Sequence, residues 1–62
     1  MQIRLLDPSY TDRLAAYLQS LGQRPVVSGP DSLDIEGELV EIEIYVRVWK
    51  VLYPDADVEI LH

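Results

Sequence analysis

The segment from Glu38 to Tyr53 constrains the fold most, because its pattern fits two kinds of secondary structure. Residues 41–48 place a β-branched apolar residue at every second position, which favours a strand. At about 100° per residue, the segment also gathers apolar side chains on about half of a helix circumference. That sector consists of Leu39, Ile42, Tyr45, Val46, Val48, Trp49, Leu52 and Tyr53. We expect a helix, because a strand of this length would exceed the usual range of about 3 to 10 residues.

Another helix is predicted earlier in the chain, between Asp7 and Gly22. Its apolar residues recur at the spacing of one helical face, while Thr11 and most of its polar neighbours are expected to face water. That face consists of Tyr10, Leu14, Tyr17, Leu18 and Leu21. Asp7 can cap the helix with Pro8 at its first position, and Ser9 is an alternative cap. Gly22 supplies a residue that readily ends a helix.

Four short segments are predicted to be strands, namely residues 3–6, 26–27, 32–36 and 58–61. The resulting order is strand, helix, strand, strand, helix, strand. This is the order of the ferredoxin-like, split βαβ fold, an antiparallel four-stranded sheet with two helices on one face. We therefore expect one α+β domain over residues 1–62. If residues 38–53 form a strand instead, a single helix packs on a curved sheet.

Sixty-two residues without cysteine leave such a fold few means of stabilisation. A domain of this size buries only about 60% of the surface of its unfolded chain, and it has no disulfide or cysteine-based metal site. The expected helix over residues 38–53 also carries apolar residues opposite Trp49, and a helix apolar on both sides is normally covered twice. We therefore expect a homodimer, or another protein partner, to cover this second face, with Arg47 pairing across a symmetric interface. The expected contact residues are Val40, Ile44, Arg47, Val48 and Val51.

The formal charge of −6 lies entirely in residues 32–62, which hold eight acidic and two basic residues. Such a charge keeps a small protein in solution and argues against binding to a nucleic-acid backbone. An alternative role is that of an acidic inhibitor or nucleic-acid mimic, which presents carboxylates to a basic target. The carboxylates concerned are Asp34, Glu36, Glu38, Glu41 and Glu43.

Side chains that carry catalysis are scarce, so we expect no enzyme activity and no cofactor. The single histidine, His62, is the last residue and is expected to be exposed. Zinc sites and nucleophilic systems that need cysteine or paired histidines lack their parts. The alternating carboxylates Asp55, Asp57 and Glu59 offer oxygen ligands of the kind that Mg²⁺ and Ca²⁺ prefer. They lack the glycine-containing loop of an EF-hand, so we assign no metal site.

The chain contains no apolar run of the roughly 18 to 20 residues that a membrane span needs. Its first residues, MQIRLLDPSY, bring charged and turn residues too early for a signal peptide. These two observations predict a cytoplasmic protein without membrane contact.

Two segments resemble known small proteins. The segment LLDPSYTDRLAAYLQSLGQRPVV resembles the first strand, helix and strand of ACT domains, which sense small molecules and have the ferredoxin-like order. Asp7 and Pro8 match the family's turn, whereas Ser9 and Tyr10 stand where it has a glycine and an apolar residue. The resemblance implies a ligand site at the turn from Asp7 to Tyr10. The segment YVRVWKVLYPDADVEIL is similar to short bacterial proteins of uncharacterised function that end in a helix, a proline turn and a strand.

Overall fold

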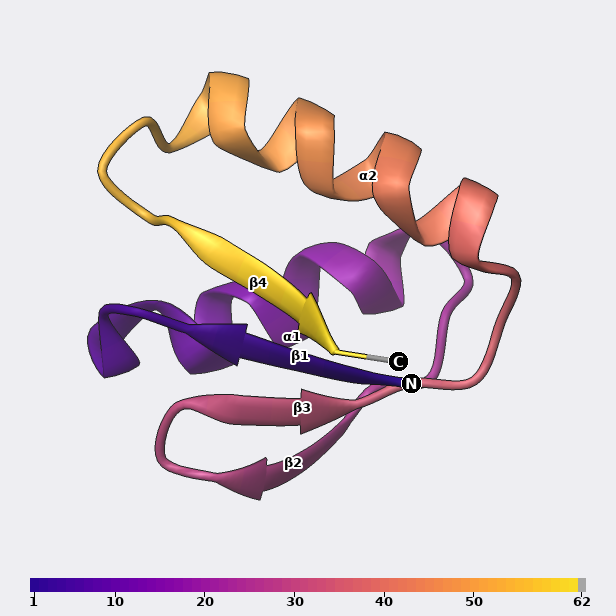
Figure 1. Cartoon of the computed structure of the whole chain (residues 1–62), viewed down its shortest axis with the longest axis horizontal. Coiled ribbons are helices and arrows are strands. Elements are labelled where there is room, and N and C mark those ends of the chain that lie inside the picture. The colour runs from indigo at the N-terminus through magenta and orange to yellow at the C-terminus, as the bar shows by residue number, and fades with distance from the viewer. Residues whose placement is uncertain (62) are drawn as a thin grey trace.

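The computed structural model describes residues 1–61 and has an antiparallel four-stranded sheet with two α-helices (Figure 1). The predicted α+β class is therefore confirmed. In the sheet, the strands follow the order β2-β3-β1-β4, and each neighbouring pair is antiparallel. His62 lies outside the described residues. The elements are β1 (Gln2–Leu5), a 3-10 helix (Pro8–Tyr10), α1 (Thr11–Ser20), β2 (Val26–Gly29), β3 (Ser32–Asp34), α2 (Leu39–Leu52) and β4 (Val58–Leu61).

The register of the sheet separates a buried face from an open one. Ile3 in β1 lies between Leu33 in β3 and Ile60 in β4, and directly paired residues point to the same side of a sheet. Ile3 and Leu33 are completely buried, whereas Arg4, the next residue along β1, is exposed on the other side. The alternation of side chains along β1 thus decides which face the helices cover.

Both helices pack against that buried face. Leu14 and Leu18 of α1 join Ile42 and Trp49 of α2 in one cluster with the buried residues of the sheet. The cluster consists of Ile3, Leu5, Leu14, Ala15, Leu18, Leu33, Ile35, Ile42, Val46, Trp49 and Ala56. Because the same cluster contains residues of β1, β3, α1 and α2, the chain has one continuous core.

Trp49 fills the space between the two helices and the segment that precedes β4. Its ring centroid lies 4.4 Å from that of Tyr53 and 5.4 Å from that of Tyr17. Its indole N–H donates a hydrogen bond to the carbonyl oxygen of Ala56 at 3.2 Å, so the polar edge of this buried ring is satisfied.

The start of the first helix differs in part from the prediction. Of the two predicted caps, Asp7 is the one used, since its carboxylate accepts bonds from the Ser9 N–H at 3.0 Å and the Ser9 hydroxyl at 2.7 Å. These bonds lower the pKa of Asp7. Thr11 is buried instead of facing water, and its hydroxyl donates to the Pro30 carbonyl at 2.7 Å. Leu21 lies beyond the end of α1 and is exposed, so its predicted place on the buried face is wrong.

The disputed segment forms the helix α2, so the strand alternative is wrong. Ile42, Val46 and Trp49 face the core as predicted. The sequence pattern places Val48 and Leu52 in the same sector, but about half of each side chain is exposed. The buried sector of α2 is thus narrower than the apolar sector of its sequence.

Candidate functional site

The outer face of α2 exposes five aliphatic side chains to solvent. Their exposed fractions run from 48% at Val48 to 79% at Val51. We define the outer face of α2 by the residues Val40, Ile44, Val48, Val51 and Leu52. Contiguous exposed apolar patches of this kind often mark interaction surfaces, whereas apolar residues that are exposed singly are normal.

This face contains most of the predicted contact residues. Val40, Ile44, Val48 and Val51 are all exposed there, and Arg47 is exposed beside them. Leu52 belongs to the same face, and its predicted place toward the core is wrong. The sequence does indicate the exposed position of Leu52, because Leu52 follows Val48 by four residues and both therefore lie in one row along the helix.

The apolar residues of this face form a continuous row. Val40, Ile44, Val48 and Leu52 follow one another at intervals of four residues, and such residues lie next to each other on a helix surface. We call these four residues the outer ridge. Val51 lies beside the ridge and widens it.

Charged residues flank the outer ridge on both sides. Glu43, Arg47 and Lys50 are exposed on one flank. Glu41 lies on the other flank, where its Oε1 accepts a hydrogen bond from the Tyr45 hydroxyl at 2.6 Å and a longer one from Gln23 Nε2 at 3.4 Å. The bond to Glu41 is the main cause of the raised pKa of Tyr45. These bonds hold the Glu41 carboxylate toward its own chain.

The five carboxylates considered for an acidic mimic do not share one surface. Asp34 pairs with Gln2 and is exposed on the open face of the sheet. Glu41 and Glu43 lie on opposite flanks of α2, about 160° apart around its axis. The structure therefore offers no single row of acids to a basic partner among these residues.

Within residues 1–61, no group of three or more metal-ligating side chains lies together in a way that could hold a metal ion. The alternation of Asp55, Asp57 and Glu59 thus does not become a cluster. Asp55 and Asp57 precede β4, and only Glu59 belongs to the strand.

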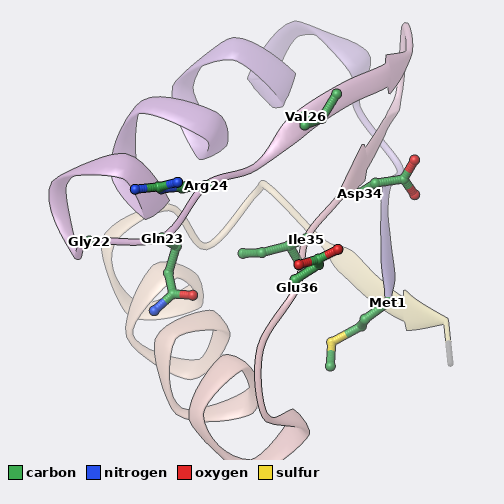
Figure 2. A pocket seen from close by; sticks show the side chains of 8 residues that line it. All are labelled: Met1, Gly22, Gln23, Arg24, Val26, Asp34, Ile35 and Glu36. Atoms are coloured by element: carbon green, nitrogen blue, oxygen red, sulfur yellow. The ribbon is translucent and has the colours of Figure 1, made fainter.

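A pocket of about 510 Å³ opens where β2 and β3 separate from each other (Figure 2). Arg24, just before β2, lines one side of it, and Asp34 and Glu36 come from the end of β3 and the residues after it. Ile35 and Val26 add apolar surface. The full lining is Met1, Gly22, Gln23, Arg24, Val26, Asp34, Ile35 and Glu36. Its size is within the range of about 300 to 1,000 Å³ that is typical of small-molecule sites.

This pocket is distant from the turn that the resemblance to ACT domains indicates. The pocket lies beside Met1, at one end of β1, whereas Asp7 follows the other end. In the turn itself, the Asp7 carboxylate is occupied by Ser9. If the protein binds a small molecule, the geometry therefore favours the pocket over the turn.

No helix in the described part of the chain combines the length and the apolar character needed to cross a membrane. Comparison of the chain with protein-family models, with curated proteins and with solved structures finds no match. The outer face of α2 and the pocket are therefore the two features of the described chain that bear on its function.

Proposed function

We propose that this protein is a small non-enzymatic interaction module that self-associates through the outer face of α2. The observation that carries the proposal is the row of large aliphatic side chains that one helix exposes to water. Removal of apolar surface from water is the main driving force for association of proteins. Association would also stabilise the fold, because the core of a chain of 62 residues without cysteine supplies only part of the stability that it needs.

A second copy of the same chain is the partner that this face fits. The outer ridge repeats at a constant interval of four residues, so it complements itself when one copy is turned by a two-fold axis. The flank with Glu43, Arg47 and Lys50 contains acidic and basic residues, so it can also form ion pairs with the same flank of a second copy. Glu41 does not disturb the ridge, because Tyr45 and Gln23 hold its carboxylate.

The test is the molar mass of the chain in solution, measured by light scattering or sedimentation from about 1 to 100 µM, the range of a moderate affinity. We expect a species of twice the 7.1 kDa chain mass. Ile44→Ser should shift the protein to the monomer and leave the helical circular dichroism unchanged, because Ile44 contacts water in the single chain. Ala16→Ser is the matched control, since Ala16 is exposed on α1. A mass of one chain at every concentration would contradict the proposal.

We further propose that the fold is the ferredoxin-like, split βαβ arrangement. The element order and the strand order β2-β3-β1-β4 support this assignment, as does the shared core beneath both helices. An experimental structure in which β1 is not central between β3 and β4 would contradict it.

The pocket beside Arg24 favours a second candidate function, that of a small-molecule sensor. Charges of both signs line it, with Arg24 on one side and Glu36 on the other, and Ile35 and Val26 add apolar surface, whereas the Asp34 carboxylate points away from it (Figure 2). This lining suits a ligand of amino-acid size that carries both charges. A melting temperature raised by one amino acid at millimolar concentration, and not by others, would support the candidate. Loss of that rise in Arg24→Gln would locate the ligand in the pocket.

A further inference from the structure

The outer ridge determines how two copies can approach each other, and this inference rests on the proposed self-association. Val40, Ile44, Val48 and Leu52 form a ridge with an interval of four residues. When two such ridges interlock, the helices cross at about −50°, which is the commonest angle between packed helices in globular proteins. A two-fold axis near the middle of the ridge then places Val40 opposite Leu52 of the other copy, and Ile44 opposite its Val48.

The charges beside the ridge distinguish the two possible directions. In an antiparallel pair, each flank meets the same flank of the other copy. Glu43 then lies between Arg47 and Lys50 of the other chain, within one to two residues along the axis. In a parallel pair, each flank meets the opposite one, and Glu43 lies near Glu41 of the other chain. Like charges at an interface disfavour the parallel pair, whereas opposite charges favour the antiparallel one.

We propose that the protein forms a two-fold symmetric dimer in which the α2 helices of two copies pack antiparallel along their outer ridges. The apolar ridge supplies the affinity, and the flank of Glu43, Arg47 and Lys50 sets the direction. In the single chain, this flank is exposed and free to make such contacts. The charged flank thus has a role in the dimer, which is to set the relative direction of the two helices.

Cysteine cross-linking tests the direction directly, because the chain has no cysteine of its own. In the antiparallel dimer, Val40 and Leu52 of different copies are neighbours, whereas two Val40 residues are about 18 Å apart along the axis. A mixture of Val40→Cys and Leu52→Cys chains should therefore form at least ten times more disulfide-linked dimer than either variant alone. Ala16→Cys, on the exposed side of α1, is the control for random collision.

The outcomes separate this inference from the proposed function. If Val40→Cys links efficiently to itself, the helices are parallel and the inference is wrong, although self-association holds. If the chain is dimeric but neither single variants nor the mixture link, the dimer uses another surface and the inference is again wrong. A monomeric mass for the unmodified chain overturns both.

A charge exchange gives a second test that does not depend on cysteine. Glu43→Lys should raise the dissociation constant of the dimer about tenfold, because it places positive charges together on the shared flank. Adding Lys50→Glu in the same chain should restore most of the affinity, since the opposite charges again face each other across the two-fold axis. Both residues are exposed, so the monomer fold should tolerate the changes. An additive loss in the double variant would overturn the antiparallel arrangement.

Discussion

The two helices cover the same face of one sheet, yet their outward surfaces differ. The exposed residues of α1 are small or polar, namely Asp12, Arg13, Ala16, Gln19 and Ser20. The exposed residues of α2 include the five aliphatic side chains of its outer face. A surface helix that packs on one side shows the pattern of α1. The comparison indicates that α1 completes its packing within the chain, whereas α2 retains apolar surface for a second contact.

The helices also differ in how they approach the sheet. The backbone of α1 lies closer to the strands than that of α2 does. Ala15 is buried on the inner side of α1 and has little bulk, whereas Trp49 occupies the corresponding side of α2. A large ring separates a helix from its sheet, but it also buries more apolar area per residue. The core therefore depends more on one residue of α2 than on any residue of α1.

Trp49→Ala should have the largest effect and tests that dependence. Removal of a buried Trp typically costs about 3 to 5 kcal/mol, and this variant also leaves the Ala56 carbonyl without its hydrogen bond. Because small domains have only a few kcal/mol of net stability, we expect a largely unfolded chain in far-UV circular dichroism. Leu14→Ala on α1 should cost less, about 2 to 3 kcal/mol at the lower end of the range for Leu→Ala, and still leave folded protein at low temperature. Equal losses for the two variants would contradict the unequal roles of the helices.

The inner residues of both helices could be predicted because periodicity shows which side chains share a face. Ile42, Val46 and Trp49 were found in this way, and the length of the segment decided helix over strand. The width of the buried sector could not be read from the pattern. A helix on a sheet buries a stripe, so Val48 and Leu52, at the margin of the apolar sector, remain half-exposed.

The predicted face of α1 is right for four of its five residues, since Leu14 and Leu18 lie in the core and Tyr10 and Tyr17 pack against it. It leaves out the buried residues Thr11 and Ala15, which follow the same helical spacing. The polar character of Thr11 hid its place in this pattern. The pocket had no sequence signal at all, because it depends on how far the chain around Arg24 separates from the chain around Glu36.

Thr11→Val should have the next largest effect and probes a link that belongs to α1. The Thr11 hydroxyl reaches the Pro30 carbonyl in the turn between β2 and β3 at 2.7 Å. Valine has nearly the same shape but no hydroxyl, so this part-buried bond is lost at a cost of about 1 to 2 kcal/mol. Urea unfolding measures the loss. Ser20→Ala removes an exposed bond to the Tyr17 carbonyl and should cost less than half as much.

The N-termini of the helices provide a smaller contrast, and here α2 can be improved. Asp7 caps the 3-10 helix that leads into α1, whereas Glu38 at the N-cap of α2 makes no capping bond with its side chain. Serine at this position accepts a bond from the first turn, so Glu38→Ser should stabilise the protein by about 1 kcal/mol. The urea midpoint should therefore rise. Glu38→Ala is the control, and an equal rise with alanine would show that removal of charge, and not capping, is responsible.

The smallest effect concerns the polar link between the helices, and the contribution of Tyr45 to it is visible only at alkaline pH. Tyr17 of α1 donates a hydrogen bond to the Tyr45 carbonyl of α2 at 2.8 Å, and the Tyr45 hydroxyl donates to Glu41. Burial raises the pKa of Tyr17, and the bond to Glu41 raises the pKa of Tyr45. The folded state thus holds these protons more tightly than the unfolded chain does. The resulting stability is complete below the ordinary tyrosine pKa of 10.0 and is lost as the pH rises through the higher folded values.

Tyr45→Phe and Tyr17→Phe divide this alkaline loss between the two helices. Tyr45→Phe removes the bond to Glu41, so the urea midpoint should change little near pH 7 and fall less steeply than that of the unmodified chain above about pH 10. Tyr17→Phe should weaken the protein at every pH, because it also removes the bond that joins α1 to α2. Tyr53→Phe is the control for loss of a tyrosine hydroxyl next to Trp49. If Tyr45→Phe leaves the alkaline slope unchanged, the bond to Glu41 does not persist in solution, and the outer face of α2 then has a mobile carboxylate at its edge.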